Sequence, residues 1–157
     1  MSTAFDDESF EFIVNELPLF ALKIPSGEIN NAPFILKHAQ TGMNIIMSTG
    51  MCDLNDIREA LGVLAYGYLC PKNTVPSSHK FGEFFESSEG MRTLKEKLTI
   101  LHCTSAYPTP INDVNLAAMK NIHDSFGISV GYSDHTEGIE TSVIAVTHGA
   151  KIIEKHI

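Results

Sequence analysis

Short apolar runs alternate along the chain with longer stretches in which apolar residues recur at helical spacing. The runs have the length of buried strands, and they are Leu19–Ile24, Asn44–Met47, Leu98–Cys103, Ile128–Tyr132 and Lys151–Lys155, with Ser2–Phe5 as the tail of a further strand. The intervening stretches carry helix-end signals, and they are Asp6–Leu17, Pro33–Gln40, Leu54–Leu69, Asp113–Phe126 and Ile139–His148. This alternation predicts parallel β/α units, because parallel strands need crossover connections.

The number of units limits the architecture. Six units are too few to close an eight-stranded barrel, which typically takes about 250 residues. The pattern leaves two alternatives, an open doubly wound sheet or an incomplete (β/α)₈ TIM barrel, and we favour the incomplete barrel. One interval is longer than the others and contains an insertion at about residues 67–96. Because the insertion includes the apolar cluster Phe81–Phe85, we expect it to pack within a single partial domain spanning residues 1–157.

Composition and charge exclude several classes of partner. The 157 residues are 43% hydrophobic and carry a net charge of −8 with no basic run, which disfavours nucleic acid and anionic membrane surfaces as partners. The three cysteines have no CxxC spacing, which excludes a disulfide framework and a zinc ribbon. The chain shows no membrane-spanning run and no signal pattern at its start, so we expect a cytoplasmic location.

Polar side chains gather where the predicted strands end. Since ligands of parallel α/β folds bind at the carboxyl ends of the strands, we expect these side chains to form one site. They are Thr3, Lys23, Ser26, Glu28, Ser48, Ser105, Tyr107, Ser133, His135 and His156. One lysine with several hydroxyls suits phosphate or carboxylate oxygens, and two imidazoles suit a divalent transition metal. Glu28 could position a substrate hydroxyl or handle a proton.

Each of these residues also has a structural interpretation. Lys23 could form an ion pair with Glu28, His135 could cap a loop, and His156 could lie in the core. The serines are common in turns, and Tyr107 before Pro108 is a common packing residue. Their joint occurrence at strand ends favours the functional interpretation. We expect the remaining histidines to be structural (His102) or on the surface (His38, His79, His123 and His148), and Cys52 and Cys103 to be buried thiols.

Five segments of the sequence resemble the sialic acid synthase family, which includes N-acetylneuraminate and legionaminic acid synthases. They are KIPSGEINN (Lys23–Asn31), MSTGM (Met47–Met51), LHCTSAYPTPINDVNL (Leu101–Leu116), GYSDHTEGIE (Gly131–Glu140) and GAKIIEKH (Gly149–His156). The segments occur in the family's order and cover nearly the whole chain outside the insertion. KIPSGE and LHCT resemble this branch more than the pseudaminic acid synthases.

The resemblance implies an activity and a set of site residues. Family members condense phosphoenolpyruvate with an N-acylated mannosamine-type sugar, giving phosphate and a nine-carbon 2-keto acid. The family's metal, Mn²⁺ or alternatively Mg²⁺ or Co²⁺, would be bound by His135 and His156. Phosphoenolpyruvate would be bound by Thr3, Lys23, Ser26, Ser48, Ser105 and Ser133, and the sugar would contact Glu28 and Tyr107. Some members have Asn at position 105, so the serine here keeps a donor on a shorter side chain.

The resemblance also implies an incomplete enzyme. Family members have a (β/α)₈ barrel followed by an antifreeze-like domain, and they form homodimers in which that domain donates an arginine to the partner's site. This sequence resembles about strands 3 to 8 of the barrel, without the first two strands or the antifreeze-like domain. We therefore expect a fragment that is inactive alone. The alternatives are a pseudaminic acid synthase and a non-catalytic truncated relic.

Overall fold

The computed structural model describes residues 1–156 and contains one parallel sheet. The strands are β1 (Ser2–Thr3), β2 (Ala21–Ile24), β3 (Asn44–Ser48), β4 (Leu98–His102), β5 (Ser129–Asp134) and β6 (Ile153–Lys155). Every neighbouring pair is parallel, and the spatial order is the chain order, β1 to β6. The predicted parallel β/α units are therefore confirmed.

Helices connect the strands. They are α1 (Asp7–Glu16), α2 (Ala32–Ala39), α3 (Leu54–Leu69), α4 (Ser78–Glu86), α5 (Ser88–Lys97), α6 (Ala117–Phe126) and α7 (Glu140–Thr147), with 3₁₀ turns at Ser26–Glu28 and Ile111–Asp113. The insertion forms the α4–α5 hairpin, whose Phe81 and Phe84 rings pack edge-on against Tyr66 of α3. It therefore packs on the domain, as its apolar cluster predicts.

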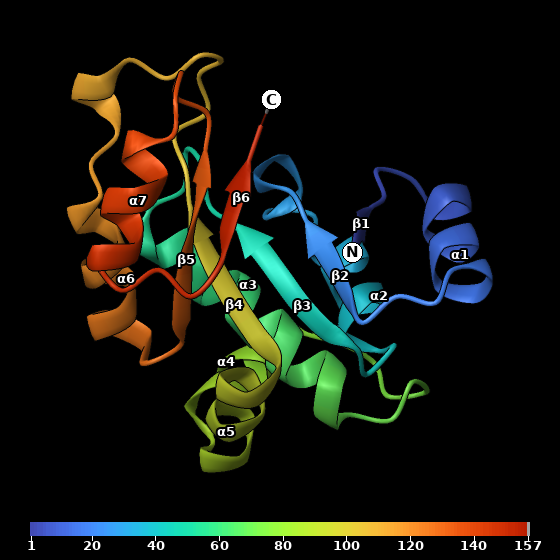
Figure 1. Ribbon diagram of the computed structural model, residues 1–157. Helices are drawn as coiled ribbons and strands as arrows, with labels where there is room; N and C mark the ends of the chain where they lie inside the picture. The colour runs from blue at the N-terminus through green and yellow to red at the C-terminus, as the bar shows by residue number, and fades with distance from the viewer. Residues whose placement is uncertain (157) are drawn as a thin grey trace.

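Strand order decides between the two predicted architectures. A doubly wound sheet reverses its strand order at a switch point, whereas here each strand lies beside its predecessor throughout. Figure 1 shows the sheet curled like part of a barrel wall, with helices around its convex face and the two chain ends at the edge strands. The architecture is a six-stranded parallel half-barrel.

Alternation along the strands separates two apolar clusters. On β2 and β3, Leu22, Ile24, Ile45 and Met47 belong to the main core between sheet and helices. The intervening positions face the concave side, where a smaller cluster consists of Ala21, Ile46 and Leu101 with Ile152 packed against it. Two residues further toward the carboxyl ends, the next inward-facing positions on β2, β3 and β6 are polar: Lys23, Ser48 and Glu154. The inner face therefore changes from an apolar layer to a polar layer within two residues.

The structure corrects two expectations. The helix predicted at Asp113–Phe126 begins only at Ala117, because Asn115 has a left-handed backbone (φ 45°) that breaks helical geometry after the 3₁₀ turn. His38 is not on the surface. It is 1% exposed between the rings of Phe10 and Phe34, and its Nδ1 lies 2.8 Å from the carbonyl oxygen of Phe34.

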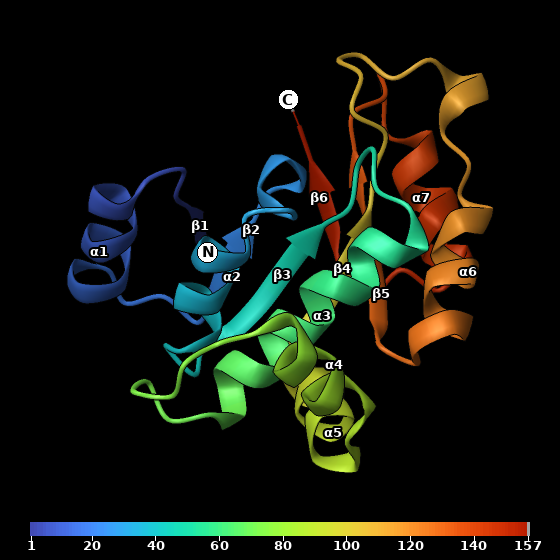
Figure 2. The ribbon, with the colours of Figure 1, turned by 180° about the vertical axis from the view of Figure 1, so that it is seen from behind.

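The insertion lies away from the carboxyl ends of the strands. Figure 2 shows α4 and α5 beside α3, at the end of the sheet opposite to the strand arrowheads. Among residues 1–156, no helix has both the length and the apolar character needed to cross a membrane.

Candidate functional site

The polar layer on the concave face surrounds a cavity of about 210 Å³ at the carboxyl ends of the strands. Alternation points Lys23, Ser48, Ser133 and Glu154 inward from four different strands. The residues that line the cavity are Thr3, Phe5, Lys23, Pro25, Ser26, Ser48, Cys103, Tyr107, Ser133, His135, Glu154 and His156. The structure thus brings together every predicted site residue except Glu28 and Ser105.

A buried lysine anchors one side of the cavity. Lys23 is 5% exposed, and its Nζ lies 3.4 Å from Glu154 Oε2. The same carboxylate oxygen accepts a hydrogen bond of 2.6 Å from Ser133 Oγ. The ion pair considered between Lys23 and Glu28 is not formed, and Glu154 takes that place. A lysine charge held this far from water is a strong local attractor for an anion.

Ser48 lies between these groups with an unused hydroxyl. Its Oγ is buried and has no hydrogen-bond partner among residues 1–156. Leaving a buried hydroxyl unpaired costs about 1–3 kcal/mol, which suggests that a ligand completes its bonding.

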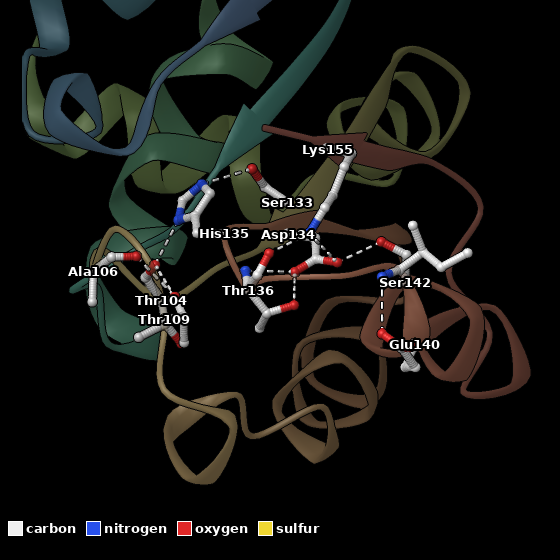
Figure 3. Close-up of polar contacts among 11 residues, drawn as sticks. Thr104, Ala106, Thr109, Ser133, Asp134, His135, Thr136, Glu140, Ser142 and Lys155 are labelled. Carbon is white, nitrogen blue, oxygen red and sulfur yellow. Dashed lines mark hydrogen bonds and ion pairs between the residues drawn. The ribbon is translucent and has the colours of Figure 1, made fainter. Parts of the chain in front are cut away.

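Hydrogen bonding fixes the orientation of the His135 imidazole. Its Nδ1 lies 2.7 Å from the carbonyl oxygen of Thr104, which can only accept, so Nδ1 carries the proton. The other nitrogen, Nε2, has a free lone pair and lies 3.3 Å from Ser133 Oγ, as Figure 3 shows. Burial, followed by the nearby His156, lowers the pKa of His135 against the opposing effect of the Thr104 bond. A neutral imidazole with an exposed lone pair is the form that binds metals.

Three rings meet at the mouth of the cavity. The His135 and His156 rings lie edge to face with centroids 4.4 Å apart, and Tyr107 stacks on His135 at 4.1 Å. In the part of the chain that the structure describes, no three His, Cys, Asp or Glu side chains form a metal-binding group. Two imidazoles alone still fit a divalent transition metal whose other positions are left for substrate or water.

Ser105 lies just outside the cavity. It lines a neighbouring cavity of about 620 Å³ between α3 and α6, but its hydroxyl approaches Gly50. A Cβ at Gly50 would lie 2.2 Å from Ser105 Oγ and 2.9 Å from Cys103 Sγ, so only glycine fits there. Ser26 Oγ is also near Gly50, which places Ser105 within reach of the site.

Glu28 points elsewhere. Its Oε2 accepts a hydrogen bond of 2.8 Å from Asn31 Nδ2, and it does not line the cavity. Its contact with a sugar stays a prediction.

Among the lining residues with ionisable side chains, sequence reasoning missed two, Glu154 and Cys103. Glu154 lies two positions before His156, so the alternation of side chains along a strand could have placed both on the same side. Cys103 is buried, as expected, and it also forms part of the cavity wall. Burial raises the pKa of Cys103 despite hydrogen bonds from Gly50 and Thr49, so it acts as a neutral wall group.

The chain is similar to known proteins over its whole length. The sequence profile described as the NeuB family matches residues 1–157. The chain belongs to the NeuB family. It is 45% identical over 156 residues to the N,N'-diacetyllegionaminic acid synthase of Campylobacter jejuni, covering 99% of the chain and 39% of that protein. It is 41% identical to the synthase of the same name from Legionella pneumophila, covering 37% of that protein.

Solved structures of similar proteins share the fold. The chain matches a spore coat polysaccharide biosynthesis protein of Bacillus subtilis with a TM-score of 0.77 at 29% identity, covering 99% of the chain and 37% of that protein. It matches the N-acetylneuraminic acid synthetase of Leptospira borgpetersenii in complex with citrate with a TM-score of 0.74 at 29% identity, covering 98% and 44%. The chain therefore spans less than half the length of these relatives.

Proposed function

We propose that the chain supplies the phosphoenolpyruvate and metal sites of a nonulosonic acid synthase. The observation that carries the proposal is the single cavity where Lys23, the unpaired Ser48 hydroxyl, Ser133 and two facing imidazoles meet. The names of the related synthases support it. We further propose that the whole enzyme acts as a homodimer in the cytoplasm, without a nucleic acid or membrane partner.

Phosphoenolpyruvate would bind at the floor of the cavity. Lys23 supplies the positive charge for its oxygens, and the hydroxyls of Thr3, Ser26, Ser48, Ser105 and Ser133 supply hydrogen bonds. Because these donors come from several strands of one rigid sheet, they would hold the substrate without further ordering of the protein.

The metal and the sugar would bind at the mouth. His135 and His156 would hold Mn²⁺, or alternatively Mg²⁺ or Co²⁺, which would polarise the aldehyde of an N-acylmannosamine-type sugar as a Lewis acid. Tyr107 would contact that sugar, and Glu28 would reach it from the 3₁₀ turn Ser26–Glu28.

The reaction would proceed in two stages. C3 of phosphoenolpyruvate forms a carbon–carbon bond with the sugar's aldehyde carbon, whose oxygen takes up a proton. Because the C2=C3 electron pair forms the new bond, C2 becomes electron-deficient; water adds there and gives up its protons, and the C2–O bond to phosphate breaks to leave the 2-keto acid and phosphate. The residues of the cavity hold C3 against the aldehyde carbon during the first stage and bind the developing negative charge during the second.

Binding of the two ligands tests this proposal directly. We expect calorimetry to show Mn²⁺ binding that His135→Ala or His156→Ala weakens at least tenfold, with the exposed His79→Ala as the matched control. Lys23→Met should weaken phosphoenolpyruvate binding about tenfold or more, and Lys37→Met, which breaks a surface ion pair with Asp7 on α1, should not. Undiminished binding of both ligands in the cavity variants would overturn the proposal.

Sequence identity favours a legionaminic-type sugar. The chain is 45% identical to the Campylobacter jejuni legionaminic acid synthase and 32% identical to a pseudaminic acid synthase of that species. Phosphate release with a panel of sugars, using the Campylobacter enzyme as positive control, separates these activities. The relic alternative is tested by the flanking nucleotides, since in-frame coding sequence for further strands and an antifreeze-like domain would contradict it.

A further inference from the structure

A second polar cluster lies back to back with the cavity, on the outer face of β5 and β6. Asp134 is 0% exposed, and its Oδ1 accepts hydrogen bonds from Thr136, 2.8 Å from the backbone N–H and 2.7 Å from the hydroxyl. Its Oδ2 accepts a bond of 2.5 Å from Ser142 Oγ and lies 3.2 Å from Lys155 Nζ. Lys155 also donates to the carbonyl oxygen of Thr136. Figure 3 shows this network beside His135.

The network lies where the two strands end. β5 and β6 pair in the register Ser133 with Glu154 and Asp134 with Lys155, and regular pairing stops there. Ser133 bonds Glu154 on the inner face, and Asp134 pairs with Lys155 on the outer face. Two successive cross-strand pairs therefore fix both faces of the sheet immediately before His135 and His156.

Beyond this point His135 is held from the β4–α6 loop, because its ring bonds the carbonyl oxygen of Thr104 and its own carbonyl oxygen accepts from the backbone N–H of Thr109, whereas His156 is held less firmly. The backbone N–H of His156 donates to the carbonyl oxygen of Asp134 at 3.3 Å, a long bond that depends on the position of Asp134. His156 is exposed, and its ring contacts only His135 and Tyr107 among the described aromatic residues. The position of the His156 ring relative to His135 therefore depends on the alignment of Asp134 and Lys155.

We propose that Asp134 and Lys155 are positioning residues that set the separation of the His135 and His156 imidazoles from the opposite face of the sheet. The proposal rests on the proposed function for the identity of the metal, but not for the geometry. Neither residue touches the cavity. Each acts through the neighbouring residue of its own strand, because successive side chains on a strand point to opposite faces.

Energetics support a role in geometry over one in stability. A buried ion pair gains little net stability over apolar residues of similar size, since desolvation offsets its attraction. The pair contributes to geometry instead. The carboxylate of Asp134 receives four donors in defined positions, and these contacts form when Asp134 is paired with Lys155.

The test compares four variants with one control in the full chain. Asp134→Asn and Lys155→Met remove the pair, Lys155→Arg conserves its charge, and the double variant Asp134→Leu with Lys155→Leu replaces it by apolar groups. The control Lys120→Met breaks the exposed pair between Lys120 and Asp124 on α6. Two properties are measured: Mn²⁺ affinity by calorimetry, and the nuclear Overhauser contact between the His135 and His156 rings without metal.

We expect Asp134→Asn and Lys155→Met to lose the contact between the rings and to bind Mn²⁺ about tenfold more weakly. Lys155→Arg should largely keep the ring contact and the Mn²⁺ affinity of the wild type, and the control Lys120→Met should change neither. The double variant should keep the thermal stability of the wild type within a few degrees without regaining the ring contact.

Two outcomes would overturn the positioning role. One is a ring contact and an Mn²⁺ affinity within twofold of the wild type in both single variants, and the other is recovery of both properties in the apolar double variant. A wild type that shows the ring contact but binds no Mn²⁺ would contradict the proposed metal alone, since loss of the contact in the variants would still support the positioning role. If a single variant unfolds, Ser142→Ala removes one donor to Asp134 with the pair intact. It should weaken the ring contact, and an unchanged contact would count against the proposal.

Discussion

Tyr107 stacks on His135 with ring centroids 4.1 Å apart and ring planes 26° apart, although the Tyr107 side chain is largely exposed. The stack joins a β4–α6 loop residue to one of the two facing imidazoles and covers one face of the His135 ring.

The stack predicts a difference between two substitutions at Tyr107. Tyr107→Phe keeps an aromatic face, so Mn²⁺ affinity should be unchanged. Tyr107→Ala removes a contact worth about 0.5–1.5 kcal/mol, so affinity should fall about two- to tenfold. Calorimetry on the two variants checks this, and equal affinities would show that the stack does not orient His135.

Because the hydroxyl of Ser48 is unpaired, we expect its removal to stabilise the fold and to weaken ligand binding. Ser48→Ala removes a buried donor without a partner, so the free energy of unfolding should rise by about 1 kcal/mol. Affinity for inorganic phosphate should fall in the same variant. Urea denaturation and phosphate titration measure the two effects.

Ser133→Ala is the matched control for that prediction. Its hydroxyl is already bonded to Glu154, so its loss should lower the free energy of unfolding by about 1 kcal/mol. Destabilisation of both serine variants to the same extent would contradict the assignment of Ser48 as an unpaired group.

The ion pair between Lys23 and Glu154 predicts that the carboxylate competes with a bound anion. Glu154→Gln removes a negative charge 3.4 Å from Lys23 Nζ, so affinity for inorganic phosphate should rise about fivefold. The exposed Glu96→Gln changes the net charge equally and should leave phosphate affinity unaltered. Weaker phosphate binding by Glu154→Gln would show that the carboxylate chiefly orients Lys23.

Buried His38 predicts a loss of stability in acid. Burial lowers the pKa of His38 in the folded chain, against a hydrogen bond to Phe34 that raises it. Because the unfolded chain takes up this proton at about pH 6.5, the contribution of His38 is present above that pH and is lost as the pH falls toward the folded pKa.

The free energy of unfolding should therefore fall from about pH 7 to about pH 5, and less steeply in His38→Gln. The exposed His79→Gln should keep the wild-type slope. Urea denaturation across this range measures both slopes, and identical slopes in all three proteins would contradict the assignment.

The local sequence pattern was sufficient to predict which side chains lie at the strand ends. It was not sufficient to predict which of these side chains contact one another. Lys23, Ser48, Ser133 and His135 could be predicted to meet because parallel strands share one carboxyl edge. The ion-pair partner of Lys23 could not be predicted, because its contact with Glu154 depends on the register of β6 relative to β5 and on the curvature of the sheet. That register is set by close packing, such as that at Gly131, where a Cβ would lie 2.5 Å from the carbonyl oxygen of Ile152.

Tertiary packing also explains the two corrected expectations. His38 has the polar character of a surface residue, and only the packing of α1 on α2 places it between Phe10 and Phe34. The late start of α6 follows from the left-handed backbone at Asn115, which the apolar periodicity from Val114 onward does not reveal. The alternative of a doubly wound sheet required the strand order, which no local pattern contains.

The distance between the α4–α5 hairpin and the cavity has a practical consequence for engineering. The loop that leads into the hairpin, residues 71–77, is largely exposed and lies at the opposite end of the sheet from the strand arrowheads. A fluorescent label, an affinity tag or an inserted reporter domain in this loop would therefore leave the ligand-binding end of the molecule unobstructed. Attachment through this loop would also immobilise the protein on a surface with its cavity facing the solution.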